Sequence, residues 1–242
     1  TLNSINSGNG AIFIAGHGLD GGSTVASTGV QFGEGMSING GSGKIHIYGV
    51  ANGGANASYS EGIRLRGVLT TDTTKYLSIV NSNSSSDAIV ISGDSSASQG
   101  TRCGGVLAVS WAARSGGGPR NVIVNTAGGG ITISGRGASS AAPDSADTQG
   151  NGIEFYGTAV LSKSGSITFN GDTAATTSTN QYGFSSNQYS IVAFPGPSYF
   201  GAQNTSPAPT WNSVDMSTST ANITWNVDSM ITPNVATSGG VA

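Results

Sequence analysis

Short segments in which apolar and polar residues alternate recur along the chain, and five of them end on a glycine. They span 10–16, 43–49, 87–93, 130–135 and 165–171. Alternation with a period of two is the signature of a β-strand that buries one face. We therefore predict a strand in each segment, whose buried positions stack into a core ladder of Ile12, Ile14, Ile45, Ile47, Ile89, Ile91, Ile131, Ile133, Ile167 and Phe169.

A polar stretch follows each of these strands, and a second strand then opens on a glycine. The second strands span 29–33, 62–67, 105–110, 152–157 and 183–186, and each opening glycine comes 12 to 17 residues after the closing one. Glycine suits a corner that needs a positive φ or a close approach of two backbones. The predicted structural turns are the closing glycines Gly16, Gly49, Gly93, Gly135 and Gly171 and the opening glycines Gly29, Gly62, Gly105, Gly152 and Gly183.

A third, looser strand leads back to the next first strand, at 36–40, 76–81, 121–125 and 159–165. The closing glycines recur after 33, 44, 42 and 36 residues, and self-similarity on this scale is typical of repeat architectures. Parallel crossovers are right-handed in nearly all proteins. The pattern thus predicts an all-β fold, a right-handed parallel β-helix (solenoid) of about five three-stranded coils over residues 1–186.

The C-terminal segment, residues 187–242, departs from this pattern. It holds five of the seven prolines together with Trp211 and Trp225, and its segment 221–227 alternates like a strand but lacks a closing glycine. Two interpretations stay open. The segment caps the solenoid, as terminal repeats do, or it docks onto a neighbouring subunit by adding a strand.

Five polar stretches, 17–28, 50–61, 94–104, 136–151 and 172–182, leave each coil at the same corner. We expect them to lie along one edge of the rod. Loops on one face of a solenoid often form its binding face, and the alternative is that they are solvated decoration.

Composition narrows the class of protein. Gly accounts for 39 of 242 residues and only 9% are charged, but Gly does not recur at every third position and the apolar residues are clustered, so neither collagen nor a flexible linker fits. The nine Lys and Arg are scattered and the net charge is −3, which argues against a nucleic-acid partner. No apolar run approaches the ~18 residues of a membrane span, so membrane insertion is not expected.

The start of the chain and its single cysteine bear on export. The first residues, TLNSINSGNG, lack the basic start and apolar core of a signal peptide, which indicates a processed terminus or a segment of a longer polypeptide. Cys103 has no partner for an internal disulfide. It is either a small buried residue or a reactive thiol that bridges to another chain.

Parallel β-helices include polysaccharide lyases and hydrolases, so the carboxylates are the first candidates for catalytic residues. Glu61 and Glu154 belong to equivalent second strands two repeats apart, roughly 10 Å in a stacked rod. Asp144 and Asp147 lie in a Pro/Ala/Ser loop that does not preorganise them. We therefore predict no catalytic residue.

Histidine and aspartate motifs are also weak. Gly16-His17-Gly18 resembles the histidine motif of polygalacturonases, but the adjacent Asp pair and the Arg-x-Lys motif of that family are missing. His17 and His46 occupy different positions of their coils, too few ligands for zinc. Asp94 and Asp172 each follow a closing glycine and are expected to be turn residues. No metal ligand and no cofactor are predicted.

Two outward patterns remain. Threonine-rich segments such as 70–74 suggest ice binding as a function. Ice binding needs a regular outward array of threonines, and the threonines do not recur in register along the sequence. Arg64 and Arg66 are expected to point outward from their strand, as a solvated face or a contact for an acidic partner.

Residues 10–186 resemble the repeats of filamentous-haemagglutinin-like exoproteins and autotransporter passengers, large bacterial surface proteins. The resemblance rests on the order G-x-I-x-I-x-G, a polar loop, G-I-x-L/F-x-G and A-V-L-x-x-x-G. It implies a right-handed β-helical stalk, secretion to the surface, a role in adhesion, aggregation or biofilm, and no cofactor.

We therefore expect a non-enzymatic extracellular structural or adhesive protein at the bacterial cell surface, a β-helical stalk or filament segment. Its expected partners are copies of itself, assembled end to end, or glycans or proteins on a host or neighbouring cell. The alternative is a polysaccharide-binding or polysaccharide-degrading protein on the same fold.

Overall fold

A computed structural model describes residues 3–19, 27–55, 59–67, 75–100, 103–110, 120–138, 150–173, 182–186, 191–192, 222–227 and 230–231. Strands are the only regular elements in these residues, which contain no helix, and so none that could cross a membrane. The all-β prediction is confirmed.

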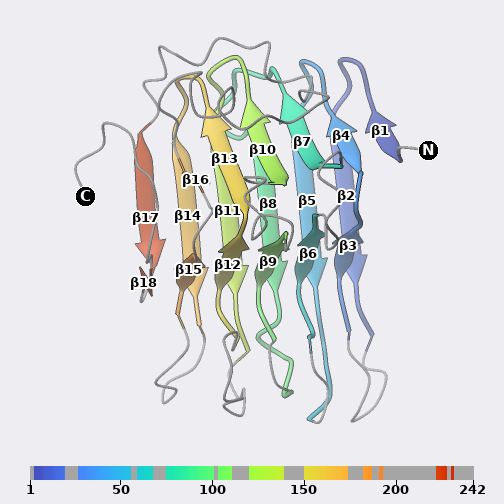
Figure 1. Ribbon diagram of the computed structural model, residues 1–242, viewed down its shortest axis with the longest axis vertical. Helices are drawn as coiled ribbons and strands as arrows, with labels where there is room; N and C mark the ends of the chain where they lie inside the picture. The colour runs from blue at the N-terminus through green and yellow to red at the C-terminus, as the bar shows by residue number, and fades with distance from the viewer. Residues whose placement is uncertain are drawn as a thin grey trace.

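The strands form three parallel sheets of six (Figure 1). Sheet A contains β1 (Ser4–Asn6), β4 (Ser37–Asn39), β7 (Leu77–Asn81), β10 (Asn121–Asn125), β13 (Thr158–Ser162) and β16 (Ile191–Val192). Sheet B contains β2 (Ile12–His17), β5 (Ile45–Val50), β8 (Ile89–Asp94), β11 (Ile131–Arg136), β14 (Ile167–Asp172) and β17 (Ile223–Val227). Sheet C contains β3 (Val30–Phe32), β6 (Ile63–Arg66), β9 (Val106–Val109), β12 (Ile153–Tyr156), β15 (Phe184–Ser186) and β18 (Met230–Ile231).

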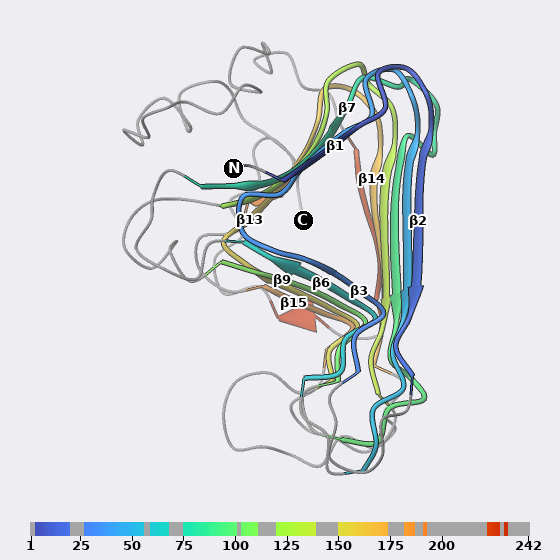
Figure 2. The same ribbon diagram turned by 90° about the vertical axis from the view of Figure 1, so that its right-hand side faces the viewer.

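The chain winds through the sheets in the order A, B, C and repeats. Figure 2 looks along the rod from the end that carries β1, and there the chain turns clockwise as it recedes, so the β-helix is right-handed. Each strand pairs with the strand three elements later, as β2 does with β5 and β5 with β8. This architecture confirms the predicted parallel β-helix.

A sixth coil continues the stack beyond the five that the glycines mark. It consists of β16, β17 and β18, which fall within the segment 187–242. Trp225 of β17 lies opposite Phe169, and Val227 occupies the position of the closing glycine opposite Gly171. The segment 221–227 therefore adds its strand to its own chain; Trp211 and the five prolines of this segment lie outside the described residues.

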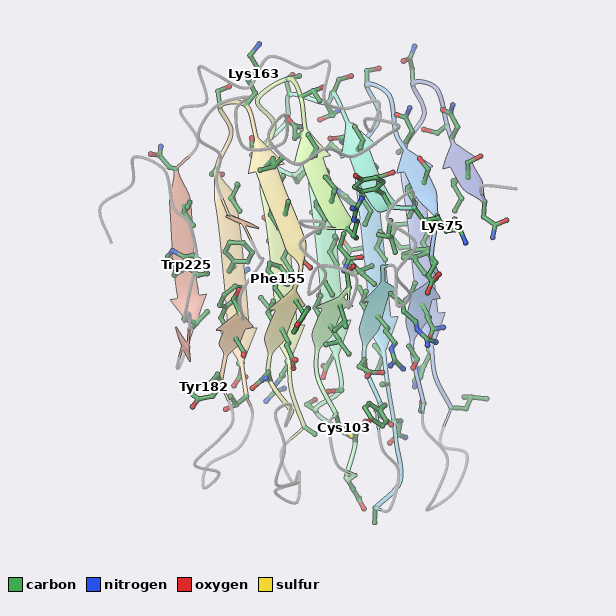
Figure 3. The ribbon with its side chains drawn as sticks, viewed as in Figure 1. Lys75, Cys103, Phe155, Lys163, Tyr182 and Trp225 are labelled. Carbon is green, nitrogen blue, oxygen red and sulfur yellow. The ribbon has the colours of Figure 1, made fainter. Side chains whose placement is uncertain are left out.

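The core fills the triangular interior and runs the length of the rod. Of the ten predicted ladder residues, eight are fully buried and Ile12 is 6% exposed. Ile14 is only half-buried, because it belongs to the first coil, which has a described coil stacked on one side only. Aromatic rings fill the far end, where Phe169 stacks on Trp225 with centroids 4.6 Å apart and Phe155 meets Phe184 at 5.3 Å. Figure 3 labels Phe155 and Trp225 in this region.

The glycines bring the backbones of sheets B and C into contact. The five closing glycines align in one column along sheet B. A Cβ on Gly135 would lie 2.0 Å from the carbonyl oxygen of Gly152, and the other four closing glycines give 2.0 or 2.1 Å to their own opening glycines. None of the closing or opening glycines has a positive φ, which among the described residues occurs at Tyr59 and at other glycines, so the requirement here is close approach.

Asparagines hold the corner between sheets A and B. The amide of Asn81 donates to the carbonyls of Gly43 and Ala88 at 3.0 and 2.8 Å, and the amide of Asn125 donates to Asn81 Oδ1 at 2.9 Å. Both side chains are buried, so these bonds satisfy backbone groups that water does not reach. The sequence analysis did not single out this pair.

Candidate binding surface

The outer face of sheet B is a flat surface along the rod. In Figure 2 sheet B forms the straight right-hand wall, and no described strand lies against its outer side. Because neighbouring strands are in register, residues at equivalent outward positions line up in rows parallel to the rod axis.

The first two coils place aromatic side chains on this face. Phe13 is 69% exposed and Tyr48 36% exposed, and their ring centroids lie 5.4 Å apart. The His46 ring meets Tyr48 edge-on at 6.2 Å. The two rings thus form one continuous exposed aromatic surface. We call Phe13 and Tyr48 the aromatic platform.

The later coils place hydroxyl and amide groups in two rows. Thr132, Thr168 and Thr224 are aligned in one row, so threonines do recur in register, which corrects the expectation drawn from the sequence. The second row, which we call the polar row, continues from Tyr48 and consists of Ser92, Ser134, Asn170 and Asn226. Three of its members are linked, since Asn226 donates to Asn170 at 2.9 Å and Asn170 to Ser134 at 3.0 Å.

A groove of about 260 Å³ runs between the polar row and a row of charged residues. The charged row consists of Asp94, Arg136 and Asp172, and the closing glycines Gly93, Gly135 and Gly171 form the floor. Arg136 Nε lies 3.1 Å from Asp172 Oδ2, and both side chains are about half exposed. We call this feature the sheet B groove.

An ion pair lies beside the aromatic platform. Lys44 Nζ is 2.7 Å from the Asp87 carboxylate, and His46 Nε2 lies 3.0 Å from the carbonyl oxygen of Asp87. The hydrogen bond from Lys44 holds the pKa of Asp87 below its usual value. The pair is solvent-exposed, so its contribution to stability is small.

Glu61 is buried at the corner between sheets B and C, directly before Gly62. Its side chain is 1% exposed and its Oε1 has no hydrogen-bond donor among the described residues. Desolvation raises its pKa to about 8, against the opposing effect of Arg64, whose Nη1 is 3.7 Å from Oε2. Glu154 adds a smaller upward effect on this pKa. Glu61 is therefore mostly protonated at neutral pH.

Glu61 and Glu154, the pair considered from the sequence, thus interact electrostatically but differ in burial. Glu154 is half-buried and accepts a hydrogen bond from Asn151 at 3.1 Å, whereas Glu61 is enclosed. Asp144 and Asp147 lie outside the described residues. No group of three or more His, Cys, Asp or Glu that could hold a metal occurs in the part of the chain that the structure describes.

The other residues singled out from the sequence fall into place as follows. His17, Asp94 and Asp172 share one outward row of sheet B, which Val50 and Arg136 complete. Arg64 and Arg66 are half-buried in β6. Cys103 is buried and burial raises the pKa of its thiol. Figure 3 shows it below the strands, at the corner between sheets B and C.

The five polar stretches all connect sheet B to sheet C, so their described ends meet at one corner of the rod. A part of each lies outside the described residues, and their role in binding stays a prediction.

The sequence analysis missed the polar row and the groove. Aligning the first strands on their closing glycines would have brought Tyr48, Ser92, Ser134 and Asn170 together, because each precedes its glycine by one residue.

No known protein family matches the chain, and no curated protein and no solved structure matches it either.

Proposed function

We propose that the chain is a non-enzymatic structural or adhesive protein, a β-helical stalk or filament segment at the outside of a bacterial cell. The observation that carries the proposal is the outer face of sheet B, where no described strand lies and where Phe13 and Tyr48 stand exposed on stacked coils. A stack of this kind holds repeated contact groups at a fixed spacing, which suits multivalent adhesion. The resemblance of residues 10–186 to exported surface repeats supports the location.

Copies of the chain are the first proposed partner. β1, β2 and β3 stand at the edges of their sheets, and no described strand pairs with their outer sides. Ile5 and Ile14 are only half-buried there, although the equivalent residues of the next coil, Ile38 and Ile47, are fully buried. Open strand edges beside unfinished apolar ladders favour end-to-end assembly.

Sedimentation velocity and electron microscopy of the purified chain test this assembly. We expect oligomers or filaments whose proportion rises with concentration. Ile5→Lys puts a charge into the open ladder and should abolish them. Ser4→Lys puts the same charge on the solvent-facing side of β1 and should not. Monodisperse monomers of the unchanged chain at high concentration would contradict assembly.

The second candidate function is polysaccharide binding or degradation. The sheet B groove, lined by hydroxyl, amide and carboxylate groups, favours binding. A released-sugar assay on neutral and acidic polysaccharides tests degradation. Turnover that Glu61→Gln or Glu154→Gln abolishes would replace the structural role with an enzymatic one.

A further inference from the structure

We propose that the sheet B groove binds a neutral glycan chain, laid along the rod axis with one end on the aromatic platform. The proposal deepens the adhesive function proposed above and rests on it, because it names the class of ligand that the outer face of sheet B would hold.

The polar row has the donors and acceptors that a chain of sugars requires. Successive members are one strand spacing apart, about 4.8 Å, so the groups recur along the groove as sugar units recur along an extended glycan. An asparagine side chain offers two donors and two acceptor sites. The bonds from Asn226 to Asn170 and from Asn170 to Ser134 use part of this capacity and fix the amide orientation. The fixed amides therefore form a preorganised surface for hydroxyl groups.

The charged side of the groove favours an uncharged ligand. Asp94 and Asp172 flank Arg136, which is paired with Asp172 at 3.1 Å. Because Arg136 is already paired with Asp172, it attracts an incoming carboxylate or sulfate only weakly. The remaining negative charge of Asp94 would repel such an anion. Carboxylates accept hydrogen bonds from sugar hydroxyls without this cost.

One ring of the aromatic platform, Tyr48, lies on the line of the polar row, and the other, Phe13, lies in the neighbouring row that leads to the threonines. Tyr48 occupies the position of the polar row one coil before Ser92, and Phe13 adjoins it at 5.4 Å between centroids. Tyr48 combines an apolar ring with a polar hydroxyl and Phe13 adds a second apolar ring, which suits a ligand that is partly apolar and partly hydrated. A pyranose ring has one such face of C–H groups. The platform would therefore hold a terminal sugar unit and fix the position of the chain along the groove.

Isothermal titration calorimetry with defined oligosaccharides tests the inference. The neutral probes are cellohexaose, xylohexaose, mannohexaose and maltohexaose, and the anionic probes are polygalacturonate oligomers and heparin fragments. We expect at least one neutral probe to bind and the anionic probes to bind at least about tenfold more weakly. Asn170→Ala and Tyr48→Ala should each weaken the neutral probe by about tenfold or more.

Gln31→Ala is the matched control, because Gln31 is an exposed amide on the outer face of β3 in sheet C. Its affinity should equal that of the unchanged chain, and circular dichroism should show all variants folded. Absence of neutral-glycan binding, stronger binding of the anionic probes, or equal loss in Gln31→Ala would each overturn the proposal. Assembly of the unchanged chain in the sedimentation experiment would then still support the structural role, so the two failures are distinguishable.

Discussion

The corner between sheets B and C and the outer face of sheet B are formed by neighbouring positions of the same strands, yet they differ in which residue types they accept. At the corner, glycine recurs in five successive coils because a Cβ would lie about 2 Å from a carbonyl oxygen. One residue earlier, the outward row changes from Tyr48 to Ser92 to Asn170. In these five coils the contact between backbones leaves room for glycine alone, whereas a solvent-exposed position can carry many side chains. Residues that determine binding can therefore differ at the exposed positions.

The largest expected change in the free energy of unfolding comes from a substitution on the buried face of sheet B, compared with the same substitution on its outer face. Ile133 is fully buried and Thr132, beside it, is half-exposed. Ile133→Asp buries an unpaired charge and should lower the free energy of unfolding by about 5 kcal/mol or leave the chain unfolded. Thr132→Asp should cost less than about 1 kcal/mol. Urea unfolding of both variants measures the difference, and similar losses would mean that the two faces are not distinct.

Glu61 is the polar exception at the corner and should make stability depend on pH. Its folded pKa of about 8 lies above the ordinary 4.5, so the protonated form is favoured by folding. The chain should therefore be most stable below about pH 4.5, as far as Glu61 is concerned, and should lose stability as the pH rises to 8 and above. The difference of about 3.5 between the two pKa values limits the loss to about 5 kcal/mol.

Glu61→Gln should remove this dependence, so that the variant exceeds the unchanged chain in stability at pH 9 and matches it near pH 4. The charged groups that act on Glu61 are Arg64 and Glu154. Arg64→Met removes the cation that lowers the pKa and should steepen the loss at high pH. Thermal unfolding between pH 4 and 9 checks both variants; parallel curves for the unchanged chain and Glu61→Gln would show that the carboxyl is not buried in solution.

Gly135→Ala tests the corner itself. The added Cβ would lie 2.0 Å from the carbonyl oxygen of Gly152, a backbone atom that cannot move without separating sheets B and C. We expect a loss of about 3 kcal/mol in the free energy of unfolding. Gly33→Ala is the control, because a Cβ on Gly33 meets nothing within 4 Å, and its stability should change by less than about 0.5 kcal/mol. If Gly135→Ala changed the free energy of unfolding as little as Gly33→Ala, close backbone approach would not be the reason why glycine recurs at this corner.

The sequence alone could predict the coils because two signals coincide, the alternation of apolar residues and the glycine at a fixed place. The sixth coil was not recognised as part of the stack because Val227 stands where a closing glycine was expected. The binding surface was missed for a different reason. Alternation says that Ser134 and Asn170 face outward, but the groove depends on which outward rows flank the glycine floor, and that is set by register across strands. The burial of Glu61 likewise depends on packing at the corner, which local pattern does not encode.

The smallest expected effect on stability belongs to the polar row. Asn170→Ala removes the bonds to Ser134 and from Asn226, both on the solvent side of sheet B. Because water replaces these partners, the free energy of unfolding should fall by less than about 1 kcal/mol. Urea unfolding measures this change, with Gln31→Ala as an exposed amide on another sheet for comparison. A loss as large as that of Gly135→Ala would mean that the polar row holds the coils together, and the outer face would then be constrained by packing as the corner is.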